Sequence, residues 1–214
     1  MLLYALLLLI FIFFVVYIAE INSPQYIGKK SEEKVSSILN KLNPAEYLIL
    51  NNLLIPSDNF IHNTQIDHLI ISNYGIFCIE TKGIRGWVSG AYNQENWTKQ
   101  IFRHYQNFYN PIKQNHTHVL ALEKILGTNL LKKNIVQFVV FTNAVTLNIS
   151  GTDNVFMAKD LLNKINQFKN IIYTNGEKTR IYNLIVQANI TNPAIRELHN
   201  KNVLELERSL ISKN

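Results

Sequence analysis

Residues 65–83 read QIDHLIISNYGIFCIETKG, and this stretch decides the fold. Its two apolar runs are Ile66–Ser72 and Ile76–Thr81, separated by Asn73-Tyr74-Gly75, whose residue types favour a tight turn. Nearly continuous apolar runs are typical of strands that are covered on both faces, as in α/β domains. The stretch therefore predicts a strand pair at the centre of an α/β fold.

Three charged side chains interrupt this apolar hairpin. Asp67 lies in the first run, while Glu80 and Lys82 end the second. Burial of an unpaired carboxylate is costly, so these groups need one another or a metal ion. Glu80 and Lys82 share a face because side chains alternate along a strand. A loop of two or four residues places Asp67 opposite Glu80 on that face, whereas a loop of three sends Asp67 to the other face unless a bulge intervenes.

We expect the shared face, which makes this end of the hairpin a candidate metal site. Two carboxylates across a strand pair, with a lysine beside them, form a set of hard oxygen ligands. Such ligands suit Mg²⁺ or Mn²⁺, with water and a substrate phosphate completing the coordination shell. The sequence therefore predicts Mg²⁺ (or Mn²⁺) as cofactor, bound by Asp67 and Glu80.

The arrangement resembles the core of the PD-(D/E)xK nucleases, in which an Asp on one strand and a D/E-x-K motif on the next hold the metal. A longer pattern resembles the NERD (nuclease-related) domain over roughly residues 26–145. It comprises Gly28-x-x-x-Glu32, the hairpin 65–83, Trp97 and Asn110-Pro111-Ile112-Lys113-Gln114-Asn115, in that order and at similar spacings. One departure is Ser31, where the family usually carries Gly before the first Glu.

The resemblance implies a restriction-endonuclease-like core, in which helices flank a mixed central sheet. It also implies a metal-dependent nuclease with five site residues, namely Glu32, Asp67, Glu80, Lys82 and Gln114.

The residues alone leave two of these roles open. Glu32 lies on the apolar stripe of a helix predicted over Ile27–Leu42, where a first-turn carboxylate also suits the helix dipole or a capping box. Gln114 follows Asn110-Pro111, which predicts a helix start with Asn as N-cap. Its amide either hydrogen-bonds water on the metal or a phosphate, or serves the helix as a cap or surface group.

The N-terminus reads as a membrane anchor. Met1–Ala19 is uncharged and apolar, just long enough at about 1.5 Å per residue for a hydrocarbon core of about 30 Å. A cleaved signal peptide is the alternative, but no basic n-region or A-x-A site is present. We expect a transmembrane anchor over residues 1–20, a linker over residues 21–26 and a nuclease domain over residues 27–214. Lys29 and Lys30 follow the anchor, which indicates a single-pass protein of the cell membrane with its C-terminal domain in the cytoplasm.

Composition favours anionic partners. The net charge is +6 and the pI is near 9.3, which suits nucleic acid or the lipid surface beside the anchor. Between Lys99 and Tyr109, basic and aromatic residues interleave, as in segments that stack on bases, although an amphipathic segment with inward aromatics has the same pattern. Arg85, near Gly83 and Gly86, suits a phosphate contact or an ordinary surface turn.

Three further apolar runs read as strands, and two segments read as helices. Strands are predicted over Tyr47–Ile55, Val136–Thr142 and Val155–Met157, and a helix over Lys159–Phe168. The last helix, over Pro193–Leu210, is predicted to turn Leu198, Val203, Leu206 and Leu210 inward.

Three functions compete. The first is a membrane-anchored, metal-dependent DNA endonuclease that acts in DNA processing or defence. The second is a catalytically weak module on the NERD scaffold that binds nucleic acid or protein. The third is a membrane-tethered adaptor in which the charges form a salt-bridge cluster without metal dependence. The set of Asp67, Glu80, Lys82 and Gln114 favours the first, with DNA as the expected partner and no protein partner identified.

Overall fold

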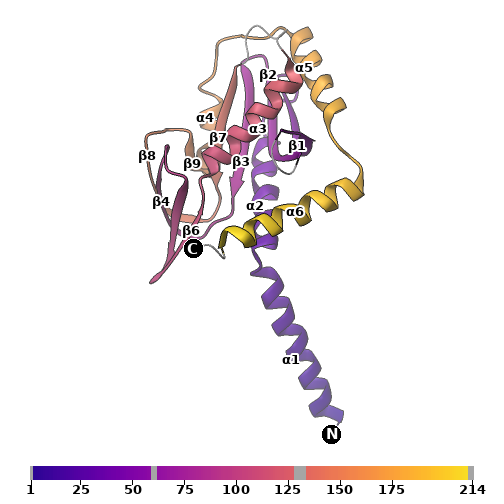
Figure 1. Ribbon diagram of the computed structural model, residues 1–214, viewed down its shortest axis with the longest axis vertical. Helices are drawn as coiled ribbons and strands as arrows, with labels where there is room; N and C mark the ends of the chain where they lie inside the picture. The colour runs from indigo at the N-terminus through magenta and orange to yellow at the C-terminus, as the bar shows by residue number, and fades with distance from the viewer. Residues whose placement is uncertain (1, 59–61, 128–133, 212–214) are drawn as a thin grey trace.

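The computed structural model describes residues 2–58, 62–127 and 134–211. A five-stranded mixed sheet in the order β1-β2-β3-β7-β9 forms its centre (Figure 1). The strands are β1 (Tyr47–Pro56), β2 (Asn63–Ser72), β3 (Gly75–Lys82), β7 (Ile135–Phe141) and β9 (Val155–Met157). β1, β2 and β3 pair antiparallel to one another, and β7 and β9 continue the sheet in parallel with β3. The three strands predicted outside the hairpin are therefore confirmed.

The β2–β3 hairpin has the predicted register, and Asp67 and Glu80 are the next positions beyond its last pair, His68–Ile79. Ser72 pairs with Gly75, so Asn73-Tyr74 is a two-residue loop. Gly75 adopts a positive φ of 145°, which a side chain would disfavour, and the Ser72 hydroxyl donates to its carbonyl at 2.9 Å. The predicted hairpin and its register are confirmed.

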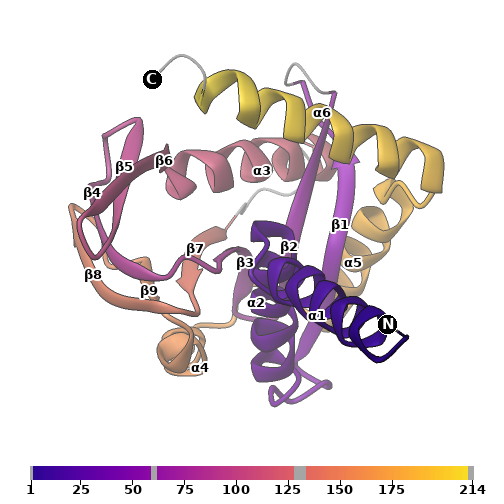
Figure 2. The same ribbon diagram turned by 90° about the horizontal axis from the view of Figure 1, so that it is seen from below.

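Helices cover both faces of the five-stranded sheet, which explains the unbroken apolar runs. Leu69 and Cys78 face α3 (Pro111–Leu126) and α5 (Asn175–Ala188), whereas Ile70 and Phe77 face α2 (Pro24–Leu39) and α4 (Leu161–Ile165). All four side chains are fully buried. Seen from below, α3 and α2 lie on opposite sides of the strands (Figure 2). The expected mixed sheet flanked by helices is confirmed.

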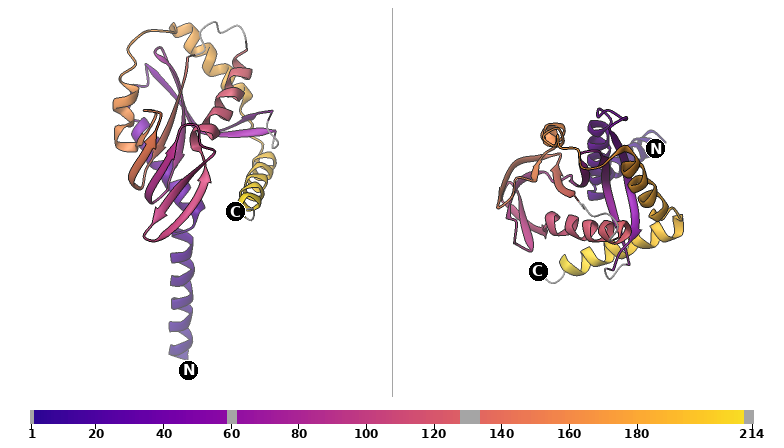
Figure 3. Two further views of the ribbon diagram at one scale, coloured as in Figure 1. Left: turned by 60° about the vertical axis from the view of Figure 1, so that its left-hand side comes forward. Right: turned by 90° about the horizontal axis from the view of Figure 1, so that it is seen from above.

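A second, four-stranded sheet in the order β6-β5-β4-β8 stands beside the first (Figures 2 and 3). Its strands are β4 (Gly86–Ala91), β5 (Asn96–Ile101), β6 (His104–Tyr109) and β8 (Ala144–Ser150). The sequence did not predict this sheet. Trp97 is completely buried beneath it and stacks on Phe141 of β7, with ring centroids 6.5 Å apart. This contact joins the two sheets.

Three predicted segments need correction at their ends. The helix expected over Ile27–Leu42 is α2, and it begins at Pro24 because the Ser23 hydroxyl caps it by accepting from Tyr26 N. The linker expected over residues 21–26 is therefore shorter. The helix expected over Lys159–Phe168 is a 3₁₀ turn, η1 (Ala158–Asp160), followed by the short helix α4.

The final helix, α6 (Pro193–Ile211), faces the domain differently from the prediction. Leu198 and Leu206 are 58% and 48% exposed, so the expectation that they point inward was wrong, whereas His199 is buried. Arg196 supplies the attachment, since its guanidinium donates to the carbonyl and the side chain of Asn52 on β1, both at 2.7 Å. A polar anchor at the sheet edge sets the rotation of α6 in place of an apolar stripe.

Helix α1 (Leu2–Ile21) projects away from the domain (Figure 1), and its described apolar side chains are exposed. Within the described residues, no single helix meets the length and hydropathy expected of a membrane span. The pair Leu6–Ile21 and Pro24–Leu39 meets it jointly, with a bend of 57° between its halves. The predicted transmembrane helix is therefore not confirmed.

Gly83, directly after β3, is the position where α2 approaches the central strand most tightly. A Cβ on Gly83 would lie 2.5 Å from Ser31 Oγ and 3.0 Å from the Ile27 carbonyl oxygen. Ser31 cannot move aside freely, because its hydroxyl donates to the Ile27 carbonyl and accepts from Thr142, both at 2.8 Å. The serine that departs from the family pattern thus ties α2 to the residue after β7.

We expect Gly83→Ala to lower the free energy of unfolding by about 1–3 kcal/mol, because the added methyl group overpacks this contact. The measurement is urea unfolding, followed by the fluorescence of the buried Trp97. Gly28→Ala is the matched control, since no atom lies within 4 Å of its Cβ position and the helix interior favours Ala over Gly. Equal stability of Gly83→Ala and the parent would contradict the tight α2–β3 contact.

Candidate active site

The predicted Glu-x-Lys pair lies at the C-terminal end of β3, beside the N-terminus of α3. Glu80 is 2% exposed, and its Oε1 lies 2.7 Å from Lys82 Nζ. Lys82 Nζ also donates to Gln114 Oε1 at 2.8 Å. The alternation of side chains along β3 brings both charged groups to α3. Three of the five predicted site residues therefore form one connected group.

The start of α3 is fixed by its sequence. Asn110 is the N-cap and accepts from Ile112 N at 2.9 Å, and Pro111 occupies the first turn, as predicted. The buried Asn115 amide donates to the carbonyls of Cys78 on β3 and Phe138 on β7, at 3.0 and 2.9 Å. These two hydrogen bonds, one to each strand, set the rotation of α3 about its axis and therefore the direction of the Gln114 side chain.

Asp67 lies where the pairing of β2 is interrupted on both sides. The bonded pairs with β3 end at His68–Ile79, and the pairs with β1 skip Asn52, the residue opposite Asp67. Asn52 has a left-handed φ of 53°, which is unusual for a residue other than glycine. The Asp67 carboxylate accepts the Thr81 N–H at 2.7 Å. The Asp67 carboxylate thus takes the place of a backbone carbonyl as the hydrogen-bond acceptor of the residue that follows Glu80.

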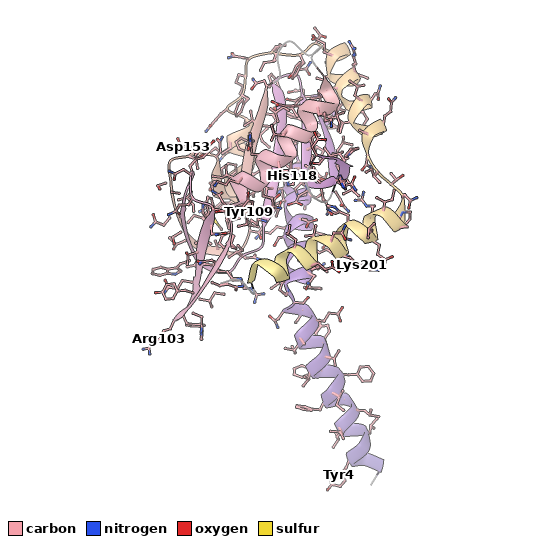
Figure 4. The ribbon with its side chains drawn as sticks, viewed as in Figure 1. Tyr4, Arg103, Tyr109, His118, Asp153 and Lys201 are labelled. Carbon is pink, nitrogen blue, oxygen red and sulfur yellow. The ribbon has the colours of Figure 1, made fainter. Side chains whose placement is uncertain are left out.

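His118 is a site residue that sequence reasoning missed. It lies one helical turn after Gln114, and its Nε2 donates to Glu80 Oε2 at 3.0 Å. Its other ring nitrogen, Nδ1, lies 2.6 Å from the Thr64 hydroxyl of β2. The ring is buried near the centre of the domain, where Figure 4 labels it. The spacing of four residues indicates that Gln114 and His118 share a face of α3, but it does not reveal that His118 contacts Glu80.

The charges at the site shift two carboxyl pKa values in opposite directions. Burial raises the pKa of Glu80, but the Lys82 ammonium and the His118 hydrogen bond outweigh burial and lower it from 4.5 to about 2. Burial raises the pKa of Asp67 well above its usual range, and the charges of Glu80 and Glu32 raise it further. The Thr81 N–H and Lys82 oppose that rise only in part. Glu80 is therefore the firmly ionised member of the pair.

Glu32 extends the site to α2. Its side chain is partly buried, and burial together with the charge of Glu80 raises its pKa, while Lys82 lowers it. The influence of both β3 residues places Glu32 on the site side of the helix, as the stripe on residues 27–42 suggested. Asp67, Glu80, Lys82 and Gln114 thus lie together at the ends of β2, β3 and α3, and Glu32 on α2 is near enough for the charges of Glu80 and Lys82 to act on it.

The donor set suits a hard cation, although the present contacts already use several oxygens. Within the described parts of the chain, no group of three or more His, Cys, Asp and Glu side chains is arranged to hold a metal ion. Lys82 and His118 occupy the two oxygens of Glu80, and Thr81 occupies one oxygen of Asp67. Burial is the main cause of the raised pKa values of Asp67 and Glu32, and the negative charge of Glu80 adds to it. A divalent cation bound here would balance that negative charge.

Comparison with known proteins agrees with this geometry. Residues 27–142 match the family described as NERD, the nuclease-related domain. An uncharacterized protein of Bacillus anthracis is 32% identical over 179 residues, covering 83% of this chain and 84% of its own length. No solved structure matches the chain. The family match ends directly after β7, and it includes every predicted site residue.

We expect the stability advantage of the parent over Glu80→Gln to shrink in acid. Because the pKa of Glu80 is lowered to about 2 in the folded chain, its ionisation stabilises the fold above its unfolded pKa of 4.5. That contribution is lost as the pH falls toward 2. The difference in unfolding free energy is expected to be about 3 kcal/mol near neutral pH and roughly half of that at about pH 3.

Urea unfolding of the parent and of Glu80→Gln at several pH values measures this difference. Gln is chosen because its side chain resembles the protonated acid in shape. A difference that stays constant across the range would contradict the ion-pair network around Glu80.

Proposed function

We propose that this chain, which belongs to the NERD (nuclease-related domain) family of the PD-(D/E)xK-like nuclease superfamily, is a metal-dependent nuclease that hydrolyses phosphodiester bonds in DNA. The observation that carries the proposal is the contact of Lys82 with Glu80 and Gln114, beside the carboxylate of Asp67. A lysine held among carboxylates at a strand end suits the stabilisation of a phosphate whose negative charge increases during hydrolysis. The net charge of +6 supports a polyanionic substrate.

Each residue has a separate task in this mechanism. Lys82 either orients the attacking water or stabilises charge on the phosphate oxygens, and electrostatic help is favoured over base catalysis because nearby anions keep an ammonium protonated. Gln114 accepts from the Lys82 ammonium and so fixes its direction. His118 holds the second oxygen of Glu80 and acts as a positioning residue.

Asp67 and Glu80 are the residues that would hold Mg²⁺ or Mn²⁺, with Glu32 adding a third carboxylate. Their oxygens are the ligands these cations prefer. When bound, the cation would supply Lewis-acid stabilisation of negative charge on the phosphate. Lys82 would then give up part of its contact with Glu80 and turn toward the substrate.

A catalytically weak module that binds nucleic acid or protein remains the second candidate. The observation that favours it is the complete use of both Glu80 oxygens by Lys82 and His118. If the contacts of Glu80 with Lys82 and His118 do not break, Glu80 cannot bind a metal ion and Lys82 cannot turn toward a phosphate.

We expect the full chain to cleave plasmid DNA with Mg²⁺ or Mn²⁺ and to stop when EDTA removes the cation. Asp67→Asn and Lys82→Met should each lower the cleavage rate by at least about 100-fold, because each removes a charge from the transition state's surroundings. His118→Asn should lose about 10–100-fold, as expected for a residue that positions a ligand. Gel electrophoresis of the plasmid measures the rates.

Asp58→Asn is the matched control, since Asp58 is exposed and pairs with Lys124 outside the site. The second measurement is thermal unfolding, in which Mg²⁺ or Mn²⁺ should raise the melting temperature of the parent but not that of Asp67→Asn. Cleavage that persists in EDTA or in Asp67→Asn would reject the mechanism. Binding of DNA without cleavage by the parent would favour the second candidate.

We also propose that α1 anchors the chain in the cell membrane as a single pass, with the domain in the cytoplasm. Support comes from the 20 residues of α1, its uncharged apolar run from residue 1 to 19, and the exposure of its described side chains. Lys29 and Lys30 follow directly and favour the cytoplasmic side.

After expression in bacteria, the parent is expected to remain in the membrane fraction through a high-salt wash. Phe11→Lys should release a substantial part of the chain, because a lysine at the centre of a span costs about 2.5–3.5 kcal/mol on insertion scales. Val186→Lys, at an exposed apolar position of α5, is the control and should not change the distribution. A parent chain found in the soluble fraction would contradict the anchor.

A further inference from the structure

The outer face of the second sheet carries two exposed aromatic rings in one row. Trp87 on β4 pairs with Gln100 on β5, which pairs with Tyr105 on β6. The rings of Trp87 and Tyr105 are 61% and 68% exposed. The inner face is different, since Trp97 is completely buried and packs edge-on against Phe108. The aromatic residues of this region therefore divide between a core and an open surface.

A shallow cavity of about 220 Å³ lies on that outer face. We call it the outer slot, and the side chains used below to describe it are those of Trp87, Ser89, Thr98, Gln100, Tyr105 and Asn148. Besides the two aromatic rings, the slot presents hydroxyl and amide groups without a charged side chain among its lining residues.

The polar groups of the slot are held in place within the sheet. Thr98 donates to Asn107 at 3.0 Å, and the Gln100 amide donates to the Phe102 carbonyl at 2.9 Å. Neutral groups that both donate and accept match the edges of nucleobases, and aromatic rings provide the surface on which bases stack. Trp87 and Tyr105 lie on either side of Gln100, two strand spacings or about 10 Å apart, so a planar base can lie across this row against either ring.

Positive charge lies at one end of this face. Arg103 is in the β5–β6 turn, and Arg85 precedes Trp87 by two residues, whereas β4, β5, β6 and β8 contain no Asp or Glu. Asp153 lies at the end of the sheet opposite to Arg103 (Figure 4). A strand whose base enters the slot would thus meet arginines near its phosphates, which is the charge arrangement expected for a polyanion.

The turn itself supports a binding role. Phe102 adopts a left-handed φ of 54°, which is unusual for a residue with a bulky side chain. The residue is 91% exposed, so its ring is not buried in the domain. The two-residue loop Phe102-Arg103 accounts for this φ, and the exposed ring is available for contact with another molecule.

The slot is also close to the candidate active site along the chain. Trp87 follows Lys82 by five residues, which span at most about 17 Å. The backbone positions of Lys82 and Trp87 therefore lie within the length of a short oligonucleotide.

We propose that the outer slot binds a nucleobase of single-stranded nucleic acid, stacked against Trp87 and Tyr105, so that the second sheet holds the strand that the candidate active site would cut. The cutting step rests on the proposed nuclease function, whereas the binding of a base does not depend on that function. The ligand expected for this sheet is single-stranded DNA or RNA, or an unpaired segment within a duplex.

The fluorescence of Trp87 tests the proposal directly. The chain contains two tryptophans, and Trp97 is fully buried, so quenching by an added oligonucleotide reports on Trp87. The full chain in detergent with EDTA is titrated with a ten-nucleotide oligothymidine, and an abasic oligomer of the same length is the matched ligand. We expect saturable quenching by oligothymidine, and weaker binding without quenching by the abasic oligomer.

Variants separate stacking from charge. Trp87→Ala and Tyr105→Ala should each weaken oligothymidine binding about tenfold or more, measured by fluorescence anisotropy of a labelled oligomer, whereas Trp87→Phe should retain most of the affinity. Tyr92→Ala is the control, since Tyr92 is an exposed aromatic residue outside the row. Equal affinity for oligothymidine and the abasic oligomer, or unchanged binding in both Ala variants, would overturn the proposal.

The outcomes distinguish this proposal from the nuclease. Quenching without any plasmid cleavage would support the slot and count against the catalytic function. Plasmid cleavage without quenching, and with Trp87→Ala as active as the parent, would do the reverse. Vesicles of phosphatidylserine and phosphatidylcholine are the last arm, because α1 has no tryptophan. A shift of Trp87 emission by vesicles, with no response to oligothymidine, would replace the slot with a lipid contact.

Discussion

A carboxylate buried at the end of the central strand must be kept ionised, and the candidate site is built around that requirement. Burial alone favours the neutral form of Glu80, and only the close ammonium of Lys82 and the ring of His118 reverse this preference. Each partner depends in turn on a neighbour, since Lys82 bonds Gln114 and His118 lies against Thr64. Loss of one partner would leave a buried charge with too few contacts, which costs more than an ion pair contributes when it is complete. One charge thus links β2, β3 and α3.

The rotation of α3 decides whether these partners meet Glu80. Gln114 and His118 are one turn apart, so they reach β3 together or not at all. Asn115 determines the outcome, because its amide bridges carbonyls of β3 and β7 and leaves little freedom for the helix to turn. Asn110 fixes the starting point through its hydrogen bonds to the carbonyls of Tyr92 and Gln94, in the turn that joins β4 and β5 of the second sheet. The second sheet therefore helps to place the helix that serves the site.

Local patterns predicted the centre of the fold, and contacts distant in sequence explain what they missed. The register of the hairpin follows from a two-residue loop, and the start of α3 follows from Asn110-Pro111, both of which are local. The second sheet depends on the pairing of β4 with β8, whose residues are more than 50 positions apart. His118 was missed for the same reason, because a histidine on a predicted helix shows no sign of the strands it will meet. Leu198 and Leu206 of α6 were wrongly predicted to point inward, because the pattern of leucines gives no sign of the anchoring contact of Arg196.

The charges at the site also explain why one lysine accompanies several acids. Glu32, Asp67 and Glu80 carry three negative charges when ionised and Lys82 carries one positive charge, which leaves a net of −2. Burial and mutual repulsion raise the pKa of Asp67 and Glu32, so protons can take up part of this excess. A divalent cation has the opposite charge of the same size, and its binding would release those protons and leave Asp67 free to act as a ligand. The site can thus be balanced by protons or by a cation. Under the proposed mechanism, a cation bound by Glu80 would weaken the hold of this carboxylate on Lys82 and so leave the ammonium able to contact a phosphate.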